Sequence, residues 1–126
     1  MSQYKQEFGE GFELGFELSR FPFLIDKSWH NDACPSFMFK AKIDSDSSGL
    51  ERCSQYLVLW VDYSNEDDRE NTRTSRYSIV TAANIGSLHE PEIYHDEHSF
   101  TLFETEESEA LTQYLSSLHI EPFYPA

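Results

Sequence analysis

Residues 56–63 read Tyr-Leu-Val-Leu-Trp-Val-Asp-Tyr and give the strongest strand signal in the chain. A strand that is apolar on both faces is usually covered by other parts of the protein on both sides. The stretch therefore predicts a central strand in which Leu57, Leu59, Trp60 and Val61 are largely buried.

Three further segments predict strands on either side of this one. In each of them apolar and polar residues alternate, as in a strand with one buried face. The segments are residues 36–43, 76–82 and 99–104. Polar loops at 44–54 and 64–74, the second a charged turn or short helix, leave no room for long helical crossovers. The strands are therefore expected to pair in a mainly antiparallel sheet.

The N-terminal segment, residues 4–19, fits two periods. Its aromatic residues recur every four positions, as on one face of a helix, but from residue 12 to residue 18 every second residue is also apolar, as in a strand. Glu, Leu and Gln favour a helix, whereas each internal Gly costs a helix about 1 kcal/mol. We expect a helix here. The recurring aromatics are Tyr4, Phe8, Phe12 and Phe16.

The C-terminal segment predicts a second helix. Thr105 is a suitable N-cap, and the acidic residues Glu106 and Glu107 then fall in the first turn, where the helix dipole favours anions. An apolar stripe at helical spacing follows. It consists of Ala110, Leu111, Tyr114, Leu115 and Leu118. Residues 120–126, with two prolines, are expected to form an extended tail.

Length and composition predict one domain, residues 1–126. The chain has 126 residues, 39% of them apolar and 15% aromatic, so it can bury a core. Taken together, the patterns predict an α+β domain. Its mainly antiparallel sheet has about four strands, and an N-terminal and a C-terminal helix pack on one face.

The charge balance excludes several classes of partner. The net charge is −14, from 23 Asp and Glu against nine Lys and Arg. Direct binding to nucleic acid or to an anionic membrane needs one cation for each phosphate contacted, so neither is expected. No apolar run reaches the roughly 18 residues of a membrane span.

The acidic residues are distributed unevenly. Residues 77–126 contain nine acidic residues and no Lys or Arg. We predict that two groups of carboxylates bind a partner, and that Arg69, Arg73 and Arg76 offset part of the charge of the second group. The first group, around the last helix, is Glu104, Glu106, Glu107 and Glu109; the second, after the central strand, is Asp62, Glu66, Asp67, Asp68 and Glu70.

These features favour a non-enzymatic binding or inhibitory protein, acting as a monomer or homodimer on a basic protein that handles nucleic acid. Duplex DNA carries one negative charge per roughly 1.7 Å of axis, and rows of carboxylates can imitate that field. Anti-restriction proteins, anti-CRISPR proteins and nuclease immunity proteins use this logic, so the analogy rests on size and charge. In a competing interpretation the chain is a scaffold domain whose acidity only keeps it in solution.

An enzyme is the other alternative. His30, Asp32 and Cys34 would project to one side of an extended strand, and an imidazole can activate a thiol by lowering its pKa. However, the chain lacks a nucleophile elbow or a glycine-rich oxyanion loop. Asn31, Asp32 and Pro35 are typical of a turn. We therefore predict no catalytic residues here.

The segment from His89 to His98 combines histidines with carboxylates. His95 and His98 would share one face of a helix, and imidazole with carboxylate is a ligand set for zinc or nickel. Pro91 and the neighbouring acids favour an exposed loop instead, so no metal or cofactor is expected.

The chain contains two cysteines, Cys34 and Cys53. Two cysteines are too few for a disulfide scaffold, so we predict reduced thiols in a cytoplasmic protein. A single disulfide between Cys34 and Cys53 is the alternative.

Overall fold

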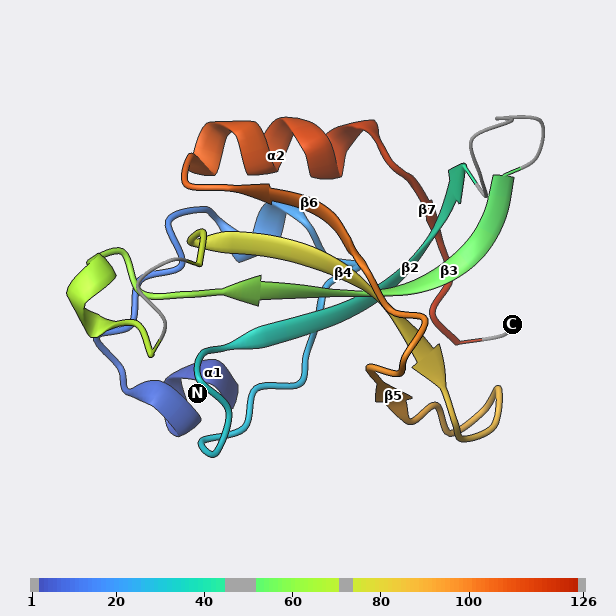
Figure 1. Ribbon diagram of the computed structural model, residues 1–126, viewed down its shortest axis with the longest axis horizontal. Coiled ribbons are helices and arrows are strands. Elements are labelled where there is room, and N and C mark those ends of the chain that lie inside the picture. Colours follow the sequence, from blue (N-terminus) through green and yellow to red (C-terminus); the bar gives the residue numbers. More distant parts are fainter. Residues whose placement is uncertain (1–2, 45–51, 71–73, 125–126) are drawn as a thin grey trace.

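Three long strands form the centre of the fold, which the computed structural model describes for residues 3–44, 52–70 and 74–124. They are β2 (Ser36–Asp44), β3 (Arg52–Val61) and β4 (Tyr77–Asn84), and they follow one another as an antiparallel meander (Figure 1). Pairing places Leu59 of β3 between Phe37 of β2 and Ile79 of β4. The most apolar stretch of the sequence is therefore the middle strand of the sheet.

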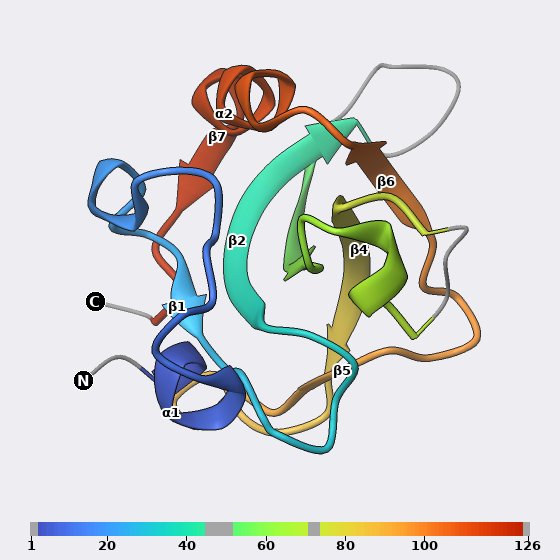
Figure 2. The same cartoon turned by 90° about the vertical axis from the view of Figure 1, so that its left-hand side faces the viewer.

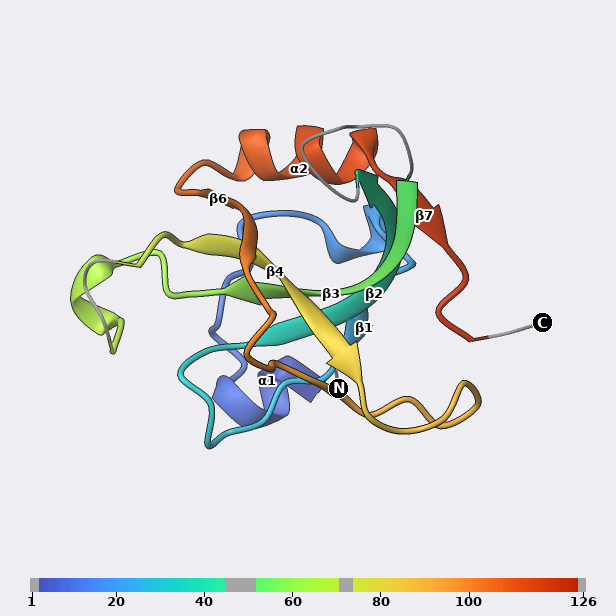
Figure 3. The same cartoon turned by 45° about the vertical axis from the view of Figure 1, so that its right-hand side comes forward.

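Four short strands lengthen the two edges of this meander. β1 (Ile25–Asp26) and β7 (His119–Glu121) both pair with the outer edge of β2, and Figure 3 shows β7 leading away from the last helix. β5 (Ile93–Tyr94) and β6 (Thr101–Thr105) both pair with the outer edge of β4. In the described part of the chain, seven strands thus form one antiparallel sheet.

The helical segments are short except for one. In chain order they are α1 (Gln3–Phe8), the 3-10 turns η1 (Leu18–Arg20) and η2 (Glu66–Asp68), and α2 (Ser108–Ser117). α2 follows β6 at one edge of the sheet and leads to β7 at the other, so it crosses one face (Figures 1 and 2). It buries Leu111 and Leu115, and Tyr114 stacks on Phe103 of β6 with 4.1 Å between ring centres.

The two faces of the sheet carry cores of different size. The face under α2 and the N-terminal segment holds the larger cluster, to which β2 and β3 contribute Phe37, Phe39, Leu57 and Leu59. The opposite face holds a small cluster, whose buried members are Val58, Val80, Ala82, Ile93 and Phe123. This second face has much less protein over it, which leaves large side chains partly open to solvent.

The predicted fold class is wrong. Within the described residues the protein is a seven-stranded sheet with one substantial helix and a six-residue helix, not a four-stranded sheet flanked by N- and C-terminal helices. The three shortest strands, with two or three residues each, are too brief to show an alternating pattern. They exist because the long neighbouring strands offer free backbone N–H and C=O groups.

The expected N-terminal helix ends at Phe8. Gly9 and Gly15 adopt positive φ values of 107° and 85°, which L-residues rarely adopt and which interrupt a helix. A Cβ atom at Gly15 would lie 2.1 Å from the hydroxyl of Tyr77, which donates a hydrogen bond to Leu14 O at 2.7 Å. The segment therefore packs as an irregular chain, yet it still buries Phe12 and Leu14 in the core.

The C-terminal predictions are partly confirmed. The predicted helix exists as α2, but Glu107 is its N-cap residue, and Thr105 instead accepts a hydrogen bond from Glu107 N at 3.1 Å. The expected extended tail is not free, because β7 pairs Ile120 with Ala41 of β2. The first residues of the expected tail are thereby part of the sheet.

The four predicted strands are all present, as β2, β3, β4 and β6. In β3 the side chains of Leu57, Leu59 and Val61 are fully buried, as expected. Trp60 is only half-buried, because it points to the thinly covered second face.

None of the helices among the described residues has the length and apolar character needed to cross a membrane.

Candidate functional site

Three segments that are distant in sequence meet at one end of the molecule. They are the loop after α1, the loop that contains η2, and the turn that leads into α2, and Figure 2 shows this end facing the viewer. Together they expose nine carboxylates, which we call the acidic end. Its members are Glu10, Glu13, Glu17, Glu66, Asp67, Asp68, Glu70, Glu107 and Glu109.

One buried cation joins two of the three segments. Arg69, 4% exposed, donates two hydrogen bonds to the carboxylate of Glu106, at 2.6 and 3.0 Å. It also donates to the backbone carbonyls of Tyr63 at 2.7 Å and Thr74 at 2.9 Å, which closes the η2 loop around it. The Arg69 hydrogen bonds hold the pKa of Glu106 below its ordinary value. The η2 loop and the start of α2 are thus fixed relative to each other.

The N-terminal loop is attached through Arg76. The backbone N–H of Arg76 donates to Glu106 at 2.9 Å, and its guanidinium donates to Glu13 O at 3.0 Å. Gln3 and Tyr4 anchor the other side of this segment, by hydrogen bonds to Ser28 O and to the Asp26 carboxylate. These contacts position the N-terminal carboxylates beside those of the other two segments.

Two hollows lie within the acidic end. The larger, about 760 Å3, lies between the N-terminal loop and α2, and its lining includes Glu13, Glu17 and Glu109 together with the cations Lys5 and Arg20. Acidic side chains of two segments therefore face one shared groove.

The smaller hollow, about 290 Å3, combines rings with carboxylates. Phe12 and Tyr63 pack edge to face at 4.9 Å, and Glu13 and Asp68 lie in the same lining. Phe12 itself is buried in the core, so the half-buried Tyr63 provides the apolar contact area beside these carboxylates.

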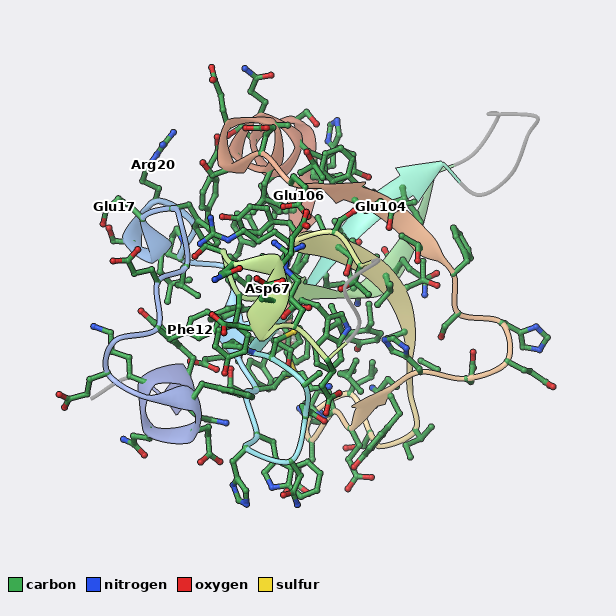
Figure 4. The ribbon with its side chains drawn as sticks, turned by 60° about the vertical axis from the view of Figure 1, so that its left-hand side comes forward. Phe12, Glu17, Arg20, Asp67, Glu104 and Glu106 are labelled. Carbon is green, nitrogen blue, oxygen red and sulfur yellow. The ribbon has the colours of Figure 1, made fainter. Side chains whose placement is uncertain are left out.

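Two of the predicted partner-binding residues are engaged by other groups of the protein, and one of the two is buried. Asp62 is 7% exposed and accepts hydrogen bonds from Tyr63 N at 2.9 Å and from Thr74 Oγ1 at 3.2 Å, so it stabilises its own loop. Glu106 is occupied by Arg69 and Arg76. Figure 4 shows Glu106 at the centre of this region, near the η2 segment that carries Asp67.

The other seven predicted residues are exposed. Six of them belong to the acidic end, and Glu104 lies on β6, where it pairs with Ser78. The six are Glu66, Asp67, Asp68, Glu70, Glu107 and Glu109.

Sequence reasoning missed Glu10, Glu13 and Glu17. They lie in the segment that was expected to be a helix, where their spacing only indicated a solvated helix face. The signal that would have found them is the row of glycines between them, which favours a loop that can approach neighbouring segments.

The charge of Arg69 is shared between Glu106 and the second group of predicted carboxylates. Arg69 pairs with Glu106, and its charge also interacts with the carboxylates of Asp62 and Glu66, two members of the second group. Arg73 lies outside the described residues. Within the described chain, none of the nine carboxylates of the acidic end forms an ion pair. Their charges are therefore not paired one to one, although Lys5 and Arg20 line the same groove as Glu13, Glu17 and Glu109.

The residues of the enzyme alternative lie in a turn rather than on a strand. Cys34 is a buried free thiol, and burial together with Asp62 and Asp32 raises its pKa to about 12. His30 is exposed and lies 3.5 Å from Glu7. A thiol with this pKa is protonated at neutral pH and is a weak nucleophile. The side chain of Cys53 lies outside the described residues.

The histidine-rich segment contains β5 and exposed turns. His95 packs edge to face on Trp60 at 6.1 Å, whereas His98 is exposed beside Glu97. Because residues 95–98 do not form a helix, the two imidazoles do not share a helix face. Among the described residues no three His, Cys, Asp or Glu side chains converge closely enough to hold a metal ion.

The chain was compared with models of known protein families, with curated proteins and with solved structures, and it matches none of them.

Proposed function

We propose that this chain is a non-enzymatic acidic binding protein whose acidic end engages a basic protein, one that handles nucleic acid. The observation that carries the proposal is the convergence of nine exposed carboxylates from three segments, none of them ion-paired within the described residues. Unpaired like charges repel one another and destabilise the compact state, so their concentration at one end favours a role in binding.

The charge pattern determines what kind of partner fits. A row of carboxylates produces the field that a basic nucleic-acid channel is built to attract. Complementary charge of this kind mainly raises the association rate and selects the partner. Tyr63, half-buried in the hollow with Glu13 and Asp68, offers the ring surface that supplies affinity once the two proteins meet.

The contacts beneath the acidic end support the same proposal. Arg69, buried and bonded to both carboxylate oxygens of Glu106, holds the η2 loop against the start of α2. The carboxylates around it are therefore positioned before binding, which lowers the entropy lost when a complex forms. We also place the protein in the cytoplasm, a proposal supported by the free thiol of Cys34.

Two matched double variants test the proposal. Glu107→Lys with Glu109→Lys changes the acidic end, and Glu90→Lys with Glu97→Lys changes exposed acids in the loop between β4 and β6. Both pairs alter the net charge by the same amount. Each protein is used as bait in the native host's lysate, and captured proteins are identified by mass spectrometry at low and high salt.

We expect the unmodified protein and the Glu90/Glu97 variant to capture the same basic protein in a salt-sensitive manner. The Glu107/Glu109 variant should no longer capture this basic protein. Free nucleic acid should compete with the unmodified protein for binding to it. Equal capture by both variants would mean that the acidity acts through net charge alone, as in a scaffold domain. That result would refute the proposal.

A further inference from the structure

The second face of the sheet contains an aromatic groove that the acidic end does not explain. Its volume is about 670 Å3, within the range of about 300–1,000 Å3 found for ligand sites. The floor includes Met38 of β2 and Trp60 of β3, and the walls come from the loop after β1 and from the β5 segment, with Trp29 and Tyr94. Trp29 is 51% exposed and Tyr94 is 57% exposed. Two large aromatic side chains of the groove are therefore exposed to solvent and available for contact with a ligand.

The two indole groups of the groove are hydrogen-bond donors. A tryptophan N–H donates and cannot accept, and within the described residues neither Trp29 nor Trp60 has a hydrogen-bond partner for it. The part of a ligand that contacts the indoles must therefore present acceptors and apolar rings. Proline supplies this combination, since it has a carbonyl, an apolar ring and no backbone N–H.

The charges in the groove specify the ligand further. Lys27 is already engaged, since its ammonium donates to Ile93 O at 3.2 Å and lies 6.0 Å from the centre of the Tyr94 ring. Burial and Lys27 lower the pKa of His95, so its imidazole is neutral at neutral pH. The carboxylates of Asp32 and Glu92 also line the groove and form no ion pair within the described residues. The groove is therefore complementary to a positively charged residue next to the apolar part of the ligand.

From this geometry we propose that the groove binds a proline-rich segment of a partner protein, with an arginine or lysine beside the prolines. Such a segment adopts the polyproline II helix, which has no internal hydrogen bonds and docks into aromatic-lined grooves. The cation that already lies over Tyr94 disfavours a methylated ammonium ligand, which would need the same ring. The groove uses residues outside the acidic end, so this proposal stands or falls separately from the proposed function.

Both tryptophans of the chain line this groove, so intrinsic fluorescence reports its occupancy directly. The probe is a synthetic peptide with one arginine followed by a run of prolines. Two control peptides replace the prolines by alternating glycine and serine, or the arginine by glutamate. Titration of the full chain with the arginine–proline peptide should give a saturable shift of tryptophan emission.

Variants locate the binding site. Trp29→Ala should weaken binding about tenfold or more, as expected for a central aromatic contact, and Trp60 remains as the reporter. Asp32→Asn should weaken the binding of the arginine–proline peptide about threefold and leave the binding of the glutamate peptide unchanged. Tyr124→Ala removes an equally exposed ring outside the groove and should change nothing. Circular dichroism checks that each variant is folded.

Several outcomes would overturn the proposal. They are the absence of a saturable shift, equal binding of the glycine–serine peptide, or unchanged binding by folded Trp29→Ala. A trimethyl-lysine peptide or a methyl glycoside that binds in place of the proline peptide would assign the groove to another ligand class and would equally overturn it.

Discussion

At the scale of single residues, Arg69 and Glu106 organise the acidic end. Arg69 has no exposed side-chain surface, so its charge needs a partner inside the protein, and Glu106 supplies both oxygens. The sequence around Arg69 indicated only a charged turn, because a pair 37 residues apart leaves no local pattern. The burial of Asp62 left no local pattern either, because its hydrogen bond from Thr74 joins residues twelve positions apart.

Glu106→Gln should destabilise the protein by about 1.5–3 kcal/mol, the range for hydrogen bonds to a charged group. The loss stays below the ~3–5 kcal/mol of a fully buried pair because the Glu106 side chain is 45% exposed. Glu107→Gln is the matched control and should change stability by less than about 0.5 kcal/mol. Urea denaturation of both variants measures the difference, and equal stabilities would contradict the role given to Glu106.

The same pair predicts a pH dependence. The pKa of Glu106 is lowered in the folded state, mainly by its hydrogen bonds with Arg69, so the pair stabilises the protein fully above the ordinary value of 4.5. That stabilisation is lost as the pH falls from 4.5 through the lower folded pKa. The free energy of unfolding, measured between neutral pH and pH 3, should therefore decrease less with falling pH for Glu106→Gln than for the unmodified protein. Parallel curves would show that Glu106 is not preferentially ionised in the folded state.

At the scale of elements, long strands could be predicted and short ones could not. β2, β3, β4 and β6 have enough residues to show alternation, whereas β1, β5 and β7 depend on the edges that the long strands offer. The N-terminal segment was misread because its aromatic spacing fits a helix, while Gly9 and Gly15 need conformations that a helix does not contain. Six of the exposed acids were anticipated, but their meeting point depends on loops whose paths the sequence does not encode locally.

The central strand gives a test of the core. Leu59 is fully buried between β2 and β4 under the N-terminal segment and α2, so Leu59→Ala should cost about 2–5 kcal/mol. Chemical denaturation measures this loss. A value below about 1 kcal/mol would place the strand at an exposed edge rather than at the centre of the sheet.

The segment after β7 gives a second test, on the thinly covered face. Phe123 is 8% exposed and packs on Tyr56 at 5.4 Å, so Phe123→Ala should cost about 3 kcal/mol, near the lower limit for such truncations. Its neighbour Tyr124 is 51% exposed, and Tyr124→Ala should be nearly neutral. Thermal unfolding of the two variants compares them. Similar midpoints would mean that the chain after β7 contributes nothing to the fold.

At the scale of the whole molecule, two surfaces differ in chemistry. The acidic end collects unpaired carboxylates from three segments, whereas the aromatic groove on the second face displays rings and indole donors. Net charge alone indicated a basic partner, but it could not show that the charge is concentrated, because Glu13 and Asp68 are brought together only by folding. The central claim is that this concentration steers a partner to one end of the protein.

The most direct measurement is the association rate constant with the captured basic partner, followed by stopped flow over a range of salt concentrations. We predict that Glu107→Lys with Glu109→Lys slows association several-fold at low salt and changes dissociation little. The Glu90→Lys and Glu97→Lys variant should associate at nearly the unmodified rate. All rates should converge at high salt, since exposed charges are screened beyond about 8 Å already at physiological ionic strength. An association rate that is the same for both double variants at low salt would contradict the account.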